Sequence, residues 1–264
     1  MSAGDGRRPP LLLCFHHAGA GVSAFARWQA RFGTAAEVVP VLLPGRDARA
    51  REPRITERAA LLAELEVAAA VTEGRPYALY GHSLGGLVAY SFAAAREAAG
   101  APPLAVAIGA VLPPHLRSPL AHSAELPDEP LLRLLVRQGV LPPSAADDEL
   151  NGGLFRRRVL PRLRDDLRLA RDLIGRAGTP LRTPVLALAG RDDPVAPPAG
   201  VAQWERFAAG GFRLRLVEGG HLFVRDKALP DLLRRELERL PATTSRAGVQ
   251  GTRARSSERQ APAA

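Results

Sequence analysis

The sequence predicts an α/β protein with one mostly parallel sheet, flanked by helices, and a helical segment inserted over one edge. Short apolar runs that read as strands alternate with segments of helical periodicity along most of the chain, which is typical of parallel strands joined by helices. One strand leads into a helix through the turn G-x-S-x-G at residues 81–85. From about residue 113 to 179 the strand-like runs stop. We therefore expect one domain over residues 1–240 with a helical insertion, the cap, at about 113–179.

Each predicted strand is a short apolar or alternating run, and each helix has apolar residues at intervals of three or four. Strands are expected at residues 11–15, 37–43, 77–80, 104–108, 184–189 and 212–217. Helices are expected at 25–32, 56–72, 86–99, 198–207 and 229–240, and within the proline-rich cap at 130–138, 147–158 and 162–176. Residues 241–264 show no periodicity and predict a disordered tail.

The composition is that of a globular protein. The chain has 264 residues, of which 46% are hydrophobic, enough for a sizeable core. Cys14 is the only cysteine, so an intrachain disulfide is excluded. Because it lies in an apolar run, it is expected in the core. No apolar run approaches the roughly 20 residues of a membrane span, and residues 1–10 lack the apolar segment of a secretion signal. We expect a cytoplasmic monomer that does not bind membranes.

The net charge of +9 is carried almost wholly by arginine, since Lys227 is the only lysine. Such a charge favours an acidic partner or substrate. It does not indicate nucleic acid, because no basic platform interleaved with aromatic residues accompanies it. The chain has no H-E-x-x-H, no cysteine pair and no glycine-rich phosphate-binding motif, so neither a metal nor a cofactor is expected.

The turn at residues 81–85 carries the candidate nucleophile. An abrupt change from strand to helix holds the residue at the apex in strained geometry and leaves no room for side chains two positions away. Gly81 and Gly85 meet that requirement on either side of Ser83. The serine then projects above the edge of the sheet, and the positive end of the following helix faces the reaction centre.

Two further candidates follow later strands, at the edge where reactive groups of parallel sheets gather. His221 would take the proton of Ser83 and return it to the leaving group, and Asp193 would hold the imidazole in one tautomer. Asp192 is the alternative acid, but Asp193 follows Gly190 by three residues, as in the usual hydrolase turn. The chain order serine, acid, histidine is that of α/β-hydrolases.

The negative oxygen formed in such a reaction needs hydrogen-bond donors. The expected donors are the backbone N–H groups of Leu84, directly after the nucleophile, and of Ala18, in the glycine-rich turn after the first strand. The neighbouring histidines have simpler interpretations. His16 and His17 are read as turn residues hydrogen-bonded to backbone, and His82 as a residue that packs under the turn and faces away.

Several segments together resemble the type II thioesterases associated with polyketide synthases and non-ribosomal peptide synthetases. The resemblance extends from about residue 9 to 240 and rests on CFHHAGAG at 14–21, LPGRD at 43–47, YGHSLGG at 80–86, LRDDLRLARD at 163–172, GRDDPV at 190–195 and EGGHLFV at 218–224. His16 stands where the family usually has proline, and residues 84–86 replace the usual Met-Gly-Ala. Both changes keep the backbone donors.

The resemblance implies an α/β-hydrolase that cleaves the thioester between an acyl, aminoacyl or peptidyl group and the phosphopantetheine arm of a carrier protein, clearing stalled or mis-primed groups. The implied partners are acyl or peptidyl carrier protein domains. No cofactor is implied, because the substrate carries the phosphopantetheine. Since carrier proteins are commonly acidic, Arg156, Arg157 and Arg158 of the cap are candidate docking residues.

Three other functions are alternatives to this one. A small-molecule esterase or peptidase of the same fold would use the same three catalytic residues. An integrated product-release domain is less favoured, because no flanking carrier domain is seen. A catalytically inactive binding protein is less favoured, because serine, acid and histidine are all present.

Overall fold

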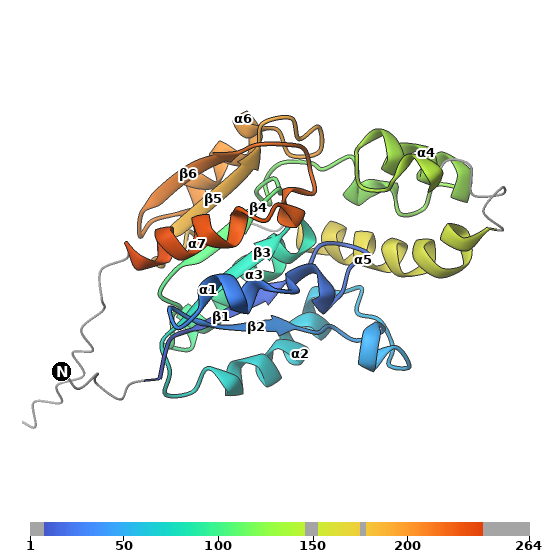
Figure 1. Ribbon diagram of the computed structural model, residues 1–264. Helices are drawn as coiled ribbons and strands as arrows, with labels where there is room; N and C mark the ends of the chain where they lie inside the picture. Colours follow the sequence, from blue (N-terminus) through green and yellow to red (C-terminus); the bar gives the residue numbers. More distant parts are fainter. Residues whose placement is uncertain (1–7, 146–152, 175–177, 240–264) are drawn as a thin grey trace, which may run out of the picture.

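The computed structural model describes residues 8–145, 153–174 and 178–239. Six strands form one sheet in the order β2-β1-β3-β4-β5-β6, and each neighbouring pair is parallel. The strands are β1 Leu11–Phe15, β2 Glu37–Val41, β3 Tyr77–His82, β4 Val106–Gly109, β5 Val185–Gly190 and β6 Phe212–Val217. The prediction of a mostly parallel sheet flanked by helices is confirmed (Figure 1).

Different helices cover the two faces of the sheet, because its central strands are buried on both sides. Along β1, Leu11, Leu13 and Phe15 belong to one core and Leu12 and Cys14 to the other, as the two-residue period of a strand requires. The first face is covered by α2 (Arg58–Val71), α3 (Leu84–Ala98) and α6 (Pro198–Val201). The second is covered by α1 (Trp28–Phe32) and α7 (Leu229–Glu238), which lie side by side in Figure 1.

The cap lies between β4 and β5 and extends beyond the end of the sheet (Figure 1). Its main helices are α4 (Asp128–Arg137) and α5 (Leu160–Leu173), and a π-helical turn, η5 (Phe155–Val159), precedes α5. Leucines at intervals of three and four give each helix one apolar face. These faces form a third core, which includes Leu131, Leu132, Leu135, Leu160, Leu163 and Leu167. The assignment of residues 1–240 to one domain stays a prediction.

Two helices differ from the predictions, because apolar periodicity does not distinguish an α-helix from a 3₁₀ helix. The helix expected at 25–32 begins only at Trp28, because Arg27 adopts a left-handed conformation with φ of 68°. The helix expected at 198–207 continues beyond α6 as a 3₁₀ helix. The 3₁₀ turns are η1 Val22–Phe25, η2 Asp47–Arg49, η3 Ala121–Ser123, η4 Pro143–Ala145, η6 Ala202–Phe207 and η7 Phe223–Arg225.

Some predictions fall on parts of the chain that are not described. Residues 147–152 of the helix expected at 147–158 lie outside the described residues, and so does the tail expected at 241–264. The helix expected at 162–176 ends at Leu173, because Ile174 is extended, and residues 175 and 176 lie outside the described residues. None of the described helices is long and apolar enough to cross a membrane.

Candidate active site

The turn between β3 and α3 has the geometry that the G-x-S-x-G spacing predicts. Ser83 has φ of 54° and ψ of −119°, a conformation that a residue with a side chain rarely adopts. A Cβ atom on Gly81 would lie 1.9 Å from the carbonyl oxygen of Gly85, and one on Gly85 would lie 2.1 Å from that of Phe15. Both glycines are therefore required, because β1 and α3 pack directly against the turn.

Three side chains from separate loops form a hydrogen-bonded row at this edge of the sheet. Nε2 of His221 lies 3.0 Å from Oγ of Ser83, and Nδ1 lies 3.0 Å from Oδ2 of Asp193. Since a carboxylate can only accept, Nδ1 carries the hydrogen and Nε2 is left to accept from the serine hydroxyl. The structure thus brings together the predicted serine, histidine and acid.

The acid in this row is Asp193 and not Asp192. Oδ1 of Asp193 also accepts the backbone N–H groups of Val195 at 2.8 Å and Ala196 at 3.1 Å, so the carboxylate is fixed and its charge is compensated. The residue is 2% exposed. Asp192, the alternative acid, is exposed.

His82 lies under the turn, as predicted, and it also holds the backbone of His221. Its Nε2 donates to the carbonyl oxygen of His221 at 2.7 Å, and its Nδ1 accepts from the hydroxyl of Tyr80 at 3.0 Å. Burial lowers the pKa of His82 well below 6.5, so the ring stays neutral. His82 is therefore no competing base. The sequence shows its place next to the nucleophile but not this contact.

The expected oxyanion donors line the same small chamber as the reacting groups. The chamber has a volume of about 40 Å³, and its walls include Ala18, Ser83, Leu84 and His221. None of the described residues accepts a hydrogen bond from the backbone N–H of Ala18 or Leu84. The N–H of Gly19, by contrast, is bound to the cap. Most other lining residues are apolar: Leu87, Val111, Leu120, Leu135, Leu167 and Ile174 among them.

A buried ion pair, which the sequence reasoning missed, joins the cap to the turn that carries Ala18. Two guanidinium nitrogens of Arg46 donate to the two carboxylate oxygens of Asp166 on α5, at 2.7 and 3.0 Å. Oδ2 of Asp166 also accepts the N–H of Gly19 at 2.7 Å. A signal was present in the sequence: Asp166 lies between Leu163 and Leu167 on the apolar face of its helix, where a carboxylate needs a buried partner.

The two histidines of the glycine-rich turn differ from each other. Nδ1 of His16 donates to the carbonyl oxygen of His17 at 3.0 Å, as expected. Nδ1 of His17 has no hydrogen-bond partner among the described residues, so the predicted hydrogen bond to backbone is not made through this nitrogen. Burial lowers the pKa of His16 to about 4 and that of His17 to about 3. Both rings are therefore neutral at physiological pH.

The candidate docking arginines lie away from the hydrogen-bonded row. Arg156, Arg157 and Arg158 belong to η5 at the start of α5. Arg157 and Arg158 are exposed, whereas Arg156 is half-buried and lines a separate hollow with Arg54. The described residues contain no group of three or more histidines, cysteines or carboxylates that could hold a metal ion.

Comparison with known proteins identifies the family. The thioesterase domain family matches residues 10–239. Thioesterase PikA5 of Streptomyces venezuelae is 37% identical over 82% of this chain and 76% of its own length. RedJ, a thioesterase from the prodiginine pathway of Streptomyces coelicolor, is 35% identical, with a TM-score of 0.74 over 89% of this chain and 94% of RedJ. YbtT, a type II thioesterase from the yersiniabactin NRPS/PKS pathway, is 27% identical, with a TM-score of 0.76 over 91% and 96%.

With its nucleophile turn at the carboxyl edge of a parallel sheet, the molecule is an α/β-hydrolase. The match over residues 10–239 places it more narrowly: the chain belongs to the thioesterase family and is a thioester hydrolase. The resemblance to type II thioesterases of polyketide and non-ribosomal peptide systems is thereby confirmed.

Proposed function

We propose that this protein is an editing thioesterase that removes acyl, aminoacyl or peptidyl groups from phosphopantetheine arms of carrier domains, with Ser83, His221 and Asp193 as its catalytic triad. The observation that carries the proposal is the hydrogen-bonded row of these three side chains in a capped chamber, within a chain of the thioesterase family. The relatives from polyketide and peptide pathways support the carrier-bound substrate.

The reaction begins with attack of Ser83 on the thioester carbonyl carbon. His221 takes the hydroxyl proton as the Oγ–C bond forms, and Asp193 stabilises the resulting imidazolium. The negative oxygen accepts hydrogen bonds from the backbone N–H groups of Ala18 and Leu84. The C–S bond then breaks, and His221 protonates the departing pantetheine sulfur, which leaves an acyl ester on Ser83.

Hydrolysis of this ester repeats the steps with water as the nucleophile. His221 takes a proton from the water, the oxygen adds to the acyl carbon, and the same two N–H groups bind the negative oxygen. The proton returns to Oγ of Ser83 as the ester bond breaks, so the enzyme is regenerated and a carboxylic acid is released. The chamber of about 40 Å³ is small for an acyl chain, so part of the cap must move during each cycle.

The decisive experiment incubates the protein with a panel of acyl-phosphopantetheinyl carrier proteins and follows deacylation by intact mass. We expect release of acyl groups, and loss of release in Ser83→Ala by at least about a thousandfold. A simple ester with the same acyl group serves as the control substrate. Hydrolysis of that ester with the carriers left intact would instead identify a small-molecule esterase. Labelling of the wild type but not of Ser83→Ala by a fluorophosphonate tests the nucleophile separately.

The acidic surface of a carrier protein is the proposed partner of Arg156, Arg157 and Arg158. Reversing these charges to glutamate should raise the KM for an acyl-carrier protein several-fold, because complementary charge favours the encounter. The KM for a small acyl thioester should stay the same, since the chamber that takes its acyl group is not lined by these three arginines. Equal changes for both substrates would show that these arginines do not dock the carrier.

A further inference from the structure

A wide cleft adjoins the catalytic chamber. It has a volume of about 670 Å³ and lies between α1, the segment before α7 and the cap. His17, Ala18, Val140 and Leu163 line both the cleft and the chamber that holds Ser83. A substrate with a long arm can therefore lie in the cleft while its reactive end reaches the nucleophile.

The outer walls of this cleft are positively charged. Arg27 and Arg31 contribute from α1 and the residue before it, and Arg225 and Lys227 contribute from the segment before α7. We call these four residues the cleft cations. Asp226 is the one carboxylate among the described residues that line the cleft. The cleft therefore offers an excess of positive charge to whatever occupies it.

Most of this charge is not neutralised by the described part of the protein. Arg31 lies 3.4 Å from Asp231, and both side chains are partly exposed. The other three cleft cations have no carboxylate partner within the described ranges, and all three are exposed: Arg27, Arg225 and Lys227. Arg27 also keeps its left-handed backbone conformation, which costs of the order of 1 kcal/mol in a residue other than glycine.

Arg225 marks the inner end of the cluster. It follows His221 by four residues and belongs to η7. After burial and the neighbouring His16 ring, the charge of Arg225 contributes to lowering the pKa of His17 to about 3. The cations thus extend from the vicinity of the chamber to the outer wall formed by α1.

We propose that the cleft cations bind the phosphodiester of the phosphopantetheine arm, a role that rests on the proposed function. The arm is neutral and rich in amide groups along its length, and it carries one negative phosphodiester at the end distant from the thioester. Guanidinium and ammonium groups bind phosphate oxygens by charge-assisted hydrogen bonds. Binding at the cleft cations fixes the charged end of the arm while the thioester lies at Ser83.

The test compares two small substrates that differ only in this charge: an acyl-pantetheine, and the methyl phosphodiester of the same acyl-phosphopantetheine. We expect the wild type to hydrolyse the phosphodiester with about tenfold higher kcat/KM, mainly through KM. In Arg225→Gln/Lys227→Gln this ratio should fall to about one. In the matched control Arg206→Gln/Arg235→Gln, which removes two exposed arginines outside the cleft, the ratio should stay at its wild-type value.

The outcomes separate this proposal from the proposed function. If both substrates are hydrolysed at equal rates by the wild type, or if the ratio survives in Arg225→Gln/Lys227→Gln, the phosphate site is wrong and the thioesterase function stands. If neither substrate nor any acyl-carrier protein is hydrolysed, the proposed function fails and this proposal with it.

A binding measurement gives a readout that is independent of turnover. Trp28 lines the cleft, so its fluorescence reports occupancy when the phosphodiester substrate is titrated into Ser83→Ala. We expect the Kd to rise about tenfold in Arg225→Gln/Lys227→Gln/Ser83→Ala, and the difference to shrink at high salt. An unchanged Kd would overturn the proposal.

Discussion

The two halves of the cap are attached to the molecule in opposite ways. The α5 half is anchored to the body by a buried contact: the side chains of Arg46 and Asp166 are 2% and 1% exposed, and Asp166 also binds Gly19. The other half, residues 113–145 with α4, is attached to α5 by the leucines of the third core and by ion pairs at the surface, with no buried ion pair among the described residues. Glu125 and Asp128, which supply the carboxylates, are 57% and 49% exposed.

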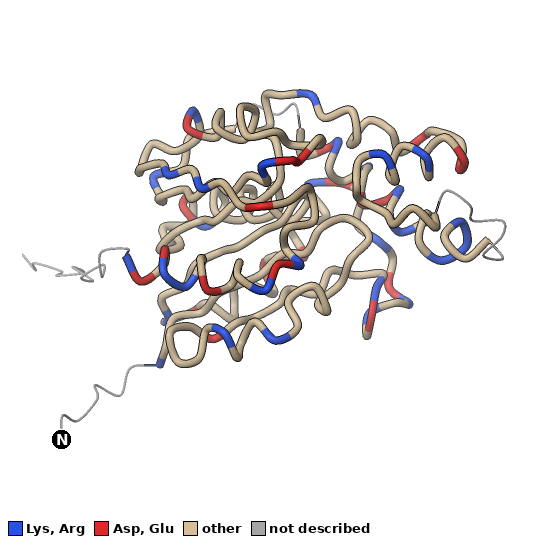
Figure 2. The backbone as a smooth tube through the Cα atoms, turned by 45° about the horizontal axis from the view of Figure 1, so that its top comes forward, with Lys and Arg blue, Asp and Glu red and all other residues tan. Residues whose placement is uncertain are grey.

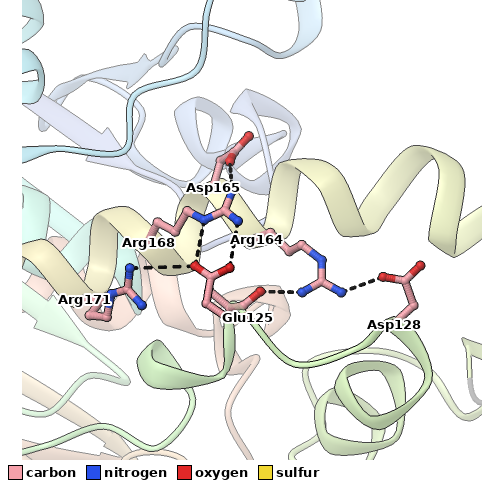
Figure 3. Close-up of polar contacts among 7 residues, drawn as sticks. Glu125, Asp128, Arg164, Asp165, Arg168 and Arg171 are labelled. Atoms are coloured by element: carbon pink, nitrogen blue, oxygen red, sulfur yellow. Dashed lines mark hydrogen bonds and ion pairs between the residues drawn. The ribbon is translucent and has the colours of Figure 1, made fainter.

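Figure 3 shows how these surface pairs are arranged. Arg164 and Arg168 extend from α5; Arg164 binds Asp128 at 2.5 Å, and Arg168 binds both oxygens of Glu125 at 3.0 Å. Figure 2 shows that both basic and acidic residues occur along the backbone of the cap. Exposed pairs of this kind contribute little stability each. They can exchange with water at low cost.

This difference in attachment identifies which half of the cap can move. Breaking the Arg46–Asp166 contact would leave two buried charges without partners and would release Gly19, next to the proposed oxyanion donor. Opening the α4 half breaks exposed ion pairs and separates apolar side chains of the third core, but it leaves no buried charge without a partner. We therefore expect α5 to stay in place during the catalytic cycle while the α4 half opens the chamber.

The largest effect should come from removing one partner of the anchor. Asp166→Ala leaves Arg46 buried and unpaired, and should lower the free energy of unfolding by about 3–5 kcal/mol. Chemical denaturation measures this loss. The double variant Arg46→Met/Asp166→Leu removes both charges and should recover much of it. If Asp166→Ala unfolds like the wild type, the anchor adds little to stability and the comparison between the two halves fails.

Acid should lower the free energy of unfolding through His16, which is buried near the Arg46–Asp166 contact. Burial, helped by the charge of Arg46, lowers the pKa of His16 to about 4 from about 6.5. Below pH 6.5 the unfolded chain binds a proton at His16 that the folded chain does not bind. The free energy of unfolding therefore has its full value above pH 6.5 and falls as the pH drops towards 4. For His16 alone the loss reaches about 3 kcal/mol near pH 4.

The measurement is the free energy of unfolding from pH 7.5 to 5, in the wild type and in His16→Gln. This range lies above the titration of the surface carboxylates, so the buried histidines dominate the slope. The variant should show a shallower decline, with His17 and His82 accounting for the remainder. Parallel curves for the two proteins would show that His16 does not carry this linkage.

The conservative variant Asp166→Asn tests whether the anchor also positions the catalytic turn. It keeps the size of the side chain but weakens the acceptor for the Gly19 N–H, so the neighbouring Ala18 should be held less firmly. We expect kcat on an acyl-pantetheine to fall about tenfold with little change in KM, because the lost interaction acts on the transition state. Asp165→Asn, which alters the contacts with Arg54 and Arg168 but leaves the Gly19 N–H bound to Asp166, is the matched control. Equal losses in both variants would mean that kcat does not depend on the anchor.

The hydrogen-bonded row of Ser83, His221 and Asp193 could be predicted from the sequence, whereas the anchor formed by Arg46 and Asp166 could not, for a physical reason. Ser83, Asp193 and His221 each follow a strand, and parallel strands bring such positions to one edge whatever the details of packing. Arg46 and Asp166 are 120 residues apart and come from a loop and a cap helix, for which no comparable rule fixes the distance. The many arginines of the cap give no indication of which distant side chain the buried carboxylate of Asp166 binds.

The smallest effect should come from the surface pairs of the α4 half. A double-mutant cycle with Glu125→Gln and Arg168→Gln should give a coupling free energy of about 0.2–1 kcal/mol that disappears in high salt. Weakening this pair should nevertheless favour the open cap, so the rate of substrate entry, measured by stopped-flow fluorescence of Trp28, should rise slightly in either variant. A large, salt-independent coupling would place the α4 half among the rigid parts of the molecule. The opening motion would then have to be assigned to α5.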